Sequence, residues 1–463
     1  MRGVISGVVA CGLVCGMVVW AGAAQRRTAQ DQSQGQGQEN RPAGVITDSP
    51  LSAPTLNRDQ ERALPLVTRY TLPPDKYAKA RRLNQIGYVG RMIAPVYQIL
   101  ILFLILGGGW SAKFRSFAER VSSNWLVEGV IYAAVAVFFV SLLMLPLDAA
   151  EHSIYRHYGL SIQGWASWLG DKAKELMVTI IVGSVAVWGV VAAIRRSPRK
   201  WWLWAWAGAV VFSAVLVFLA PVVIDPLFNK FDPLAEHDAP LTRALERVVD
   251  RAGLTIPVDR MYWMAASEKV RTMNAYVTGL GASKRVVVWD TTIANATTPE
   301  IIFVFGHELG HYVLGHIPKQ LAILAAIFLV LFYVGFKGSM ALLRRRWAGW
   351  GIREADDLAA LPVYFATLLV LMFLCTPLLN AMSRHYEHQA DQYGLEITHG
   401  LTPDSGEMAA RSFQVLGEMN LADPAPARWE ILLFYDHPWI GDRIKFSLEY
   451  DPWAAGGNGE FVK

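Results

Sequence analysis

Two histidines and a glutamate fall close together in an otherwise apolar stretch of the chain, residues 301–316. His307, Glu308 and His311 have the spacing H-E-x-x-H. On a helix the two histidines lie one above the other, so their imidazole nitrogens can converge on one metal ion. Glu308 lies one residue round the helix, where its carboxylate can act as a base on a water molecule beside the metal. The pattern therefore predicts the metal site of a zinc hydrolase.

The stretch that carries this motif is expected to be helical. Thr298 offers a hydroxyl cap, Pro299 suits the first helical position, and Glu300 places an acid in the first turn. The alternative is that the motif residues are ordinary polar side chains on a helix. We consider this alternative poor, because two histidines and a glutamate inside an apolar segment are costly to desolvate without a partner.

A catalytic zinc site needs a third protein ligand. His316 follows His307 by nine residues, whereas the H-E-x-x-H-x-x-G-x-x-H pattern places its third histidine about ten residues after the first. If the helix continues, His316 also falls off the face that carries His311. We therefore exclude His316 as the third ligand.

A better candidate lies in residues 383–391, a second segment of helical pattern. Glu387 and Asp391 are four residues apart there, so they share one helix face. Glu387 would complete a His-His-Glu zinc site, and Asp391 would orient a ligand imidazole from behind. His385 and His388 compete with Glu387 for the ligand role, and spacing alone does not exclude them.

The composition is that of a membrane protein. Of the 463 residues, 53% are hydrophobic and only 18% are charged, which is typical of a polytopic membrane protein rather than of a soluble one. The formal net charge of +4 is small for this length, so we expect no nucleic-acid partner. Cys11, Cys15 and Cys375 lie in apolar segments and offer neither a disulfide framework nor a cysteine zinc site.

The chain divides into segments of different composition. Residues 1–24 combine an early arginine, an apolar run and Ala-Gly-Ala, which fits a signal peptide or an N-terminal membrane anchor. Residues 25–60 are expected to be a disordered, Gln-rich linker. Residues 61–224 should form an amphipathic helix and four transmembrane helices, at about 92–109, 124–147, 175–194 and 201–224. Two more transmembrane helices are expected within residues 321–381, at about 321–343 and 361–381.

The polar block 225–320 is expected to be the zinc metalloprotease domain. It should contain an amphipathic helix and three short strands, at residues 242–253, 260–265, 274–279 and 284–289. Turn residues between the last two strands predict a hairpin that leads into the metal helix. The edge of such a hairpin can hold an extended peptide through backbone hydrogen bonds, although a purely structural hairpin is the alternative. Residues 382–463 would supply the Glu387 helix and the C-terminal part of the catalytic domain.

The C-terminal tail adds two further candidates. His437 precedes a proline, and Arg443 follows six residues later. A histidine and an arginine at an active site can stabilise the oxyanion that forms when water attacks a peptide carbonyl. Taken alone, a histidine before a proline is more often a surface loop residue.

Taken together, these blocks resemble the type I CAAX prenyl endopeptidase family of integral-membrane zinc metalloproteases. The likeness runs from about residue 70 to the C-terminal tail and covers motifs in a fixed order: Asp225-Pro-Leu-Phe-Asn, Asn274-Ala-Tyr, Lys284-Arg, Gly306-His-Glu-Leu-Gly-His, Ser383-Arg with Glu387-His-Gln-Ala-Asp, and His437-Pro with Arg443. So many ordered blocks are far more specific than H-E-x-x-H by itself.

The resemblance implies one zinc ion per chain, Zn2+ bound by His307, His311 and Glu387. It implies that Glu308 is the general base and later the proton donor. It also implies a mainly α, polytopic membrane fold in which six or seven transmembrane helices enclose a chamber beside a zincin-like α+β metalloprotease domain.

The same resemblance places further residues around the site. Asn274 and Ala275 would lie on the strand edge that aligns the substrate, and His437 and Arg443 would face the reacting peptide. Six transmembrane helices are evident, and a seventh would require residues 1–24 to remain as a membrane helix.

The distribution of basic residues indicates an orientation. Lysines and arginines cluster in three short loops, 113–120, 195–200 and 344–353, which alternation of the helices places on one side of the membrane. The positive-inside rule makes that side cytoplasmic, so the zinc site would lie on the exported face. The alternative, which the family resemblance implies, is a site that opens toward the cytosol. An exported segment after a signal peptide also favours a multi-pass protein of the bacterial inner (cell) membrane.

We therefore expect a membrane-embedded zinc endopeptidase whose partners are the lipid bilayer and a peptide or protein substrate. Membrane-associated, misfolded or C-terminally lipidated proteins are all possible substrates. The alternatives are CAAX-type C-terminal processing alone, or a non-catalytic membrane scaffold or transporter with a structural metal site. A structural zinc normally fills its coordination with Cys or His, which argues against the scaffold. Nothing in the sequence indicates an oligomeric state.

Overall fold

The computed structural model describes residues 66–279, 284–454 and 456–462. The expected signal peptide or anchor at residues 1–24 and the expected linker at residues 25–60 lie outside the described residues.

Six helices in the described part of the chain are long and apolar enough to cross a membrane, as the sequence predicts. Most of them extend beyond their expected apolar cores. The six are α4 (Pro74–Gly107), α6 (Trp125–His157), α7 (Trp165–Arg196), α8 (Trp201–Leu219), α14 (His316–Arg346) and α15 (Leu361–Thr398). The predicted basic amphipathic helix is the first part of α4. Helix α8 continues through a π-helical turn, Ala220–Ile224, into the short α9 (Asp225–Phe228).

The outer surfaces of these helices are apolar. Leu104, Met177, Ile181 and Leu374 are exposed over 62–67% of their surface. Large apolar surfaces of this kind are unfavourable in water. Between the helices, α4, α6, α14 and α15 share a single buried hydrophobic cluster. An apolar exterior around an apolar interior is the arrangement expected in a lipid bilayer.

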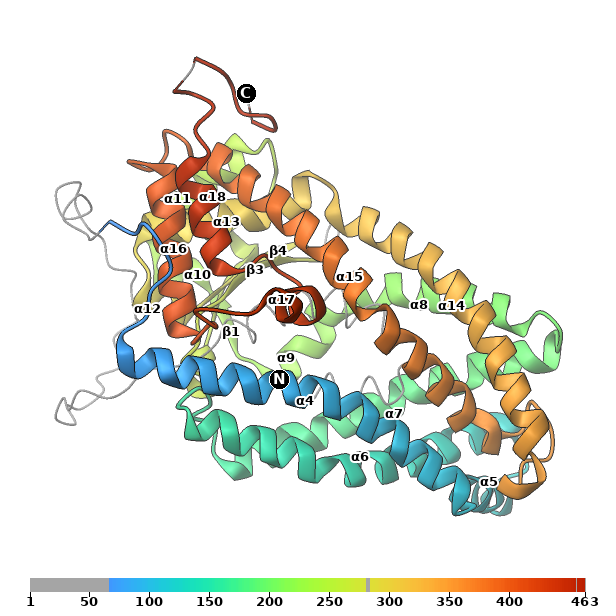
Figure 1. Cartoon of the computed structure of the whole chain (residues 1–463). Coiled ribbons are helices and arrows are strands. Elements are labelled where there is room, and N and C mark those ends of the chain that lie inside the picture. The colour runs from blue at the N-terminus through green and yellow to red at the C-terminus, as the bar shows by residue number, and fades with distance from the viewer. Residues whose placement is uncertain (1–65, 280–283, 455, 463) are drawn as a thin grey trace.

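The three predicted basic loops meet at one end of the molecule. Helix α5 (Trp110–Val121) brings Arg115 to within 2.5 Å of Asp357, in the connection between α14 and α15. Arg353 of that connection lies 2.6 Å from Glu119, and Arg195 at the end of α7 lies 3.2 Å from Asp356. Figure 1 shows α5 at the opposite end of the molecule from the sheet. The expectation that these loops share one side is therefore met.

A small four-stranded sheet lies at the other end (Figure 1), with the strand order β1-β2-β4-β3. Its strands are β1 (Phe231–Pro233), β2 (Met261–Met264), β3 (Ala275–Thr278) and β4 (Arg285–Trp289). Strands β3 and β4 pair antiparallel, as the predicted hairpin requires, and β2 pairs with β4 in parallel. The sequence did not predict β1, a three-residue strand that contains a proline. Strand β3 is left as the edge that faces the motif helix.

Shorter helices complete this part of the molecule. They are α10 (Leu234–His237), α11 (Ala239–Arg251), α12 (Asp290–Asn295), α13 (Thr298–Val313), α16 (Ser405–Met419), α17 (Arg428–Phe434) and α18 (Ile440–Glu449). Of these, α10, α12 and α13 pack against the sheet. Helix α11 begins three residues before the predicted start at residue 242, because the Asp238 carboxylate accepts a hydrogen bond from the Leu241 N–H.

The expected segment boundaries at 320/321 and 381/382 fall inside the continuous helices α14 and α15. The membrane helices and the catalytic part therefore share these two helices. Helix α15 is the longer of the two, with 38 residues, and runs diagonally from the membrane helices into the catalytic part (Figure 1).

Candidate metal centre

Helix α13 carries the H-E-x-x-H motif and begins one residue away from the predicted cap. The cap is Thr297 rather than Thr298. Its backbone N–H donates to the Glu300 carboxylate at 2.8 Å, which satisfies one of the free donors at the helix start. Pro299 lies in the first turn, as expected.

Glycines allow α13 and α15 to approach each other closely. A Cβ on Gly306 would lie 2.7 Å from the Ile397 side chain, and a Cβ on Gly310 would lie 3.0 Å from that of Tyr393. A Cβ on Gly394 of α15 would lie 3.1 Å from the backbone nitrogen of His307. Because these positions lack side chains, the two helices pack almost backbone to backbone, which brings the motif histidines next to Glu387.

Three buried donor atoms converge at this crossing. The Nε2 atoms of His307 and His311 are 3.2 Å apart. Each lies 3.3 Å from a carboxylate oxygen of Glu387. Two imidazole nitrogens and a carboxylate at such short mutual distances form a donor set that could hold one metal ion. The structure brings together the three residues that the sequence analysis selected.

His307 is supported from behind by Asp391 and Arg443. Its Nδ1 lies 2.8 Å from the Asp391 carboxylate, which itself accepts two hydrogen bonds from Arg443 at 2.5 and 2.8 Å. Burial opposes a charge on His307, but hydrogen bonds to Asp391 and Glu387 raise its pKa to about 9 in the absence of a metal. The predicted orienting contact of Asp391 is thus present in the structure.

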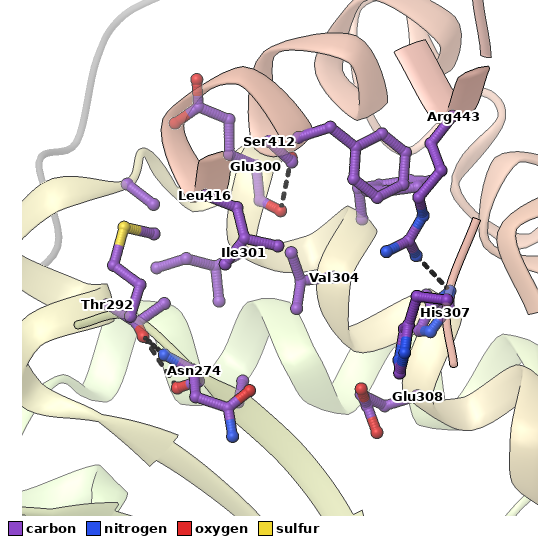
Figure 2. A pocket seen from close by; sticks show the side chains of 16 residues that line it. Asn274, Thr292, Glu300, Ile301, Val304, His307, Glu308, Ser412, Leu416 and Arg443 are labelled. Carbon is purple, nitrogen blue, oxygen red and sulfur yellow. Dashed lines mark hydrogen bonds between the residues drawn. The ribbon is translucent and has the colours of Figure 1, made fainter. Parts of the chain in front are cut away.

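Arg443 lines the cavity beside His307. Its guanidinium is buried, stacks over the Phe413 ring and lies 3.4 Å from His307 Nδ1 (Figure 2). It also donates two hydrogen bonds to the Asp391 carboxylate, so it holds the partner of His307 in place.

Glu308 points into the cavity below His307 (Figure 2). Burial raises its pKa, an effect that the neighbouring His307 and His311 oppose. One carboxylate oxygen, Oε2, has no hydrogen-bond partner among the described residues. The backbone of Val277 in β3 bonds to the carboxylate and holds it in place. A buried carboxylate with a free oxygen and a raised pKa has the properties of a general base.

His437 approaches the donor cluster from the loop before α18. Its Nε2 lies 3.0 Å from Glu387, and its Nδ1 lies 2.9 Å from Asp436. Burial disfavours a charge here, but Glu387 and Asp436 raise the pKa of His437 to about 10. The side chain is therefore buried beside the donor cluster rather than exposed in a surface loop, and its raised pKa favours the protonated form in the absence of a metal.

A cavity with about 610 Å³ of empty space opens beside His307 and Glu308. Asn274 and Ala275, at the start of the edge strand β3, line it. The sequence analysis missed the largely apolar remainder of the wall, which α13 and α16 supply: Ile301, Phe303, Val304, Phe413 and Leu416. Helix α16 could have been suspected only from its amphipathic pattern.

The competing histidines have other positions. His385 and His388 are exposed on α15, and His388 packs over the Phe446 ring instead of reaching the cluster. His316 is not one of the three clustered donors, in agreement with its exclusion. However, the reason given for that exclusion assumed one continuous helix. In the structure α13 ends at Val313, and His316 begins a new helix after Gly315.

Membrane-length helices joined to a buried His-His-Glu cluster, with the Glu308 carboxylate in the cavity beside it, define a membrane-embedded metalloprotease. The comparisons with known proteins agree with this class. Residues 235–450 match peptidase family M48, and residues 55–230 match the N-terminal domain of CAAX prenyl proteases, described as five membrane helices. The chain belongs to peptidase family M48, in its CAAX prenyl protease-like branch.

Relatives occur in bacteria and in eukaryotes. The chain is 34% identical to the uncharacterized metalloprotease YhfN of Bacillus subtilis, over 81% of this chain and 86% of that protein. It is 27% identical to CAAX prenyl protease 1 of Saccharomyces cerevisiae, over 67% of this chain and 69% of that protein.

A solved structure shares the fold. The crystal structure of S. mikatae Ste24p superposes with a TM-score of 0.69 and covers 96% of this chain and 99% of that chain, at 18% sequence identity. The expected fold, a mainly helical, polytopic membrane protein with a chamber and a small sheet, is confirmed.

Proposed function

We propose that this chain is a zinc endopeptidase that cleaves membrane-associated proteins. The observation that carries the proposal is the donor set of His307, His311 and Glu387, beside which one carboxylate oxygen of Glu308, Oε2, has no hydrogen-bond partner among the described residues. Around a tetrahedral zinc ion with bonds of about 2.0–2.1 Å, neighbouring donors lie roughly 3.3 Å apart. The 3.2 Å between the two imidazole nitrogens fits that arrangement, and each nitrogen lies 3.3 Å from a different carboxylate oxygen of Glu387.

The catalytic roles follow from the positions of the side chains. A zinc ion held by the three donors would supply Lewis-acid activation of water and of the peptide carbonyl. Glu308 would take the proton of the attacking water and later give it to the leaving amine. His437, which is buried 3.0 Å from Glu387 and has a raised pKa, would stabilise the negative charge that develops on the carbonyl oxygen.

The edge of β3 would align the substrate as an extended strand. The Asn274 backbone is already engaged, because its N–H donates to Thr292 and its carbonyl accepts from Thr292 and Trp289. Only the Asn274 side chain is therefore offered to a substrate. We infer that Ala275, which lines the cavity without a bulky side chain, is where the peptide backbone approaches.

Two substrate classes remain within this proposal. The sequence features favour general cleavage of membrane-associated or misfolded proteins in a bacterial inner membrane, with the site on the exported face. Relatives named CAAX prenyl proteases favour C-terminally prenylated peptides as the alternative. A non-catalytic scaffold with a structural metal would cleave neither class.

The decisive experiment uses the purified full-length chain. Wild type should cleave a fluorogenic membrane-protein substrate, lose activity with a chelator and regain it with zinc. Glu308→Gln should bind zinc like wild type but lose about 10²–10⁴-fold in kcat, the usual contribution of a general base. Cleavage by Glu308→Gln at the wild-type rate would refute the assignment, and a prenylated peptide tested in parallel distinguishes the two substrate classes.

A further inference from the structure

The two histidines of the H-E-x-x-H motif have different supports. His307 bonds through Nδ1 to a carboxylate, that of Asp391. His311 instead faces another imidazole, with 3.1 Å between its Nδ1 and the Nδ1 of His316. The far nitrogen of His316, Nε2, lies 3.2 Å from the side-chain oxygen of Gln389. His311, His316 and Gln389 thus form a hydrogen-bonded relay of three side chains that ends on a neutral amide.

The positions of the hydrogens in this relay follow from the two groups at its ends, His311 and Gln389. Nε2 of His311 faces the other donors, so it must keep its lone pair for a metal. Its proton is then on Nδ1, which donates to His316 Nδ1. His316 consequently carries its own proton on Nε2 and donates it to the Gln389 oxygen. All three side chains are satisfied only when the hydrogen bonds run in this direction.

The backbone turn between the helices makes the contact possible. Gly315 has φ +66°, a conformation that residues with a Cβ rarely adopt. The turn ends α13 and starts α14 at His316, so that the His316 side chain folds back toward His311. His316 is 1% exposed and lies against the Tyr386 ring, with 4.7 Å between the ring centroids. Its orientation is therefore fixed by packing.

We propose that His316 is a positioning residue that sets the tautomer and ring angle of His311, and that Gln389 holds His316 in the matching tautomer. The role rests on the proposed metal set and extends it behind the second histidine. Partners of this kind typically contribute about 10–100-fold to metal affinity. The Gln389 amide is uncharged, so it supports His311 more weakly than the Asp391 carboxylate supports His307.

The test measures metal affinity instead of cleavage. The full-length chain is stripped of metal, and zinc is titrated against a chromogenic chelator. His316→Leu removes the acceptor and should weaken zinc binding about 10–100-fold. In His316→Asn, the amide oxygen takes the place of Nδ1 and should restore affinity to within about threefold of wild type. His385→Leu, at an exposed histidine on α15, is the matched control and should bind like wild type.

A second readout reports geometry. Cobalt bound to wild type and to His316→Asn should give the same visible spectrum, and His316→Leu should shift it. Wild-type affinity in His316→Leu would overturn the proposal, as would an equal loss in the Leu and Asn variants, which would indicate a purely steric role. If His316→Leu does not fold, Gln389→Met decides: reduced zinc affinity supports the proposal and wild-type affinity overturns it.

These outcomes are independent of peptide cleavage. A chain that binds zinc in a His316-dependent way but cleaves no peptide would refute the proposed function and leave this inference standing.

Discussion

At the scale of single residues, the centre packs polar and charged side chains so closely that they would repel one another without a cation or a proton between them. Two imidazoles face each other at 3.2 Å beside a buried carboxylate. The ion pair with Arg443 holds the Asp391 carboxylate in place, and this carboxylate in turn fixes the His307 imidazole. Such a cluster is stable when a cation or a proton occupies it, so metal and protons should compete for it.

Metal binding should therefore depend on pH. The pKa of His307 is raised to about 9 without metal, so at neutral pH a bound zinc ion must displace the His307 proton. Zinc affinity should rise by up to about tenfold per pH unit below that pKa and level off above it. Chelator competition at several pH values measures this slope, after correction for the chelator's own protonation.

Asp391→Asn provides the control for this prediction. The substitution removes the charge that raises the pKa of His307, so the plateau should be reached at lower pH. A zinc affinity that is independent of pH from about pH 6 to about pH 8 would contradict the prediction.

At the scale of elements, the centre depends on how closely α13 and α15 cross. Glu387 lies 76 residues beyond His311 in the sequence, so only this crossing places it beside the imidazoles. The glycines at the crossing leave no room for added atoms, since a Cβ at residue 394 would meet the backbone of His307 itself. A larger residue at 394 must displace a candidate metal ligand.

Gly394→Val should therefore weaken both folding and metal binding. Overpacking of this kind costs about 1–3 kcal/mol, and the displaced His307 should lower zinc affinity by at least about tenfold. Gly90→Val is the matched control, because nothing lies within 4 Å of a Cβ at this exposed α4 position. Thermal unfolding and chelator competition measure the two effects. Wild-type zinc affinity in Gly394→Val would show that the crossing tolerates expansion.

The sequence predicts the local features well and the long-range ones less well. H-E-x-x-H, the six apolar segments and the β3–β4 hairpin are periodic or closely spaced patterns. The position of His316 was missed because the helix was assumed to continue, and Gly315 was the one local sign of a turn. The pairing of Arg443 with Asp391 joins residues 52 apart, and no spacing rule encodes such a contact.

At the scale of the whole molecule, charge is distributed unevenly along the long axis. The three basic loops meet around α5, and the metal centre lies at the opposite end (Figure 1). From the positive-inside rule we expect the α5 end to be cytoplasmic and the metal centre to lie on the exported side.

Cysteine accessibility tests this orientation. Arg247→Cys on α11 and Arg345→Cys at the end of α14 replace exposed residues at the two ends. In intact cells, a membrane-impermeant thiol reagent should label Arg247→Cys and should reach Arg345→Cys only after permeabilisation. The unsubstituted chain, with its own cysteines, supplies the blank. The reverse labelling pattern would place the metal centre in the cytoplasm.

Helix α15 serves both the bilayer and the metal cluster. Its 38 residues extend over roughly 57 Å, whereas the hydrocarbon core of a bilayer is about 30 Å thick. The part of α15 that carries Glu387 and Asp391 therefore extends beyond the membrane-spanning part. A thicker or thinner bilayer changes the tilt of such a helix, and its far end moves most. We therefore expect lipid chain length to affect where Glu387 stands relative to the two imidazoles, each of which lies 3.3 Å from one of its oxygens.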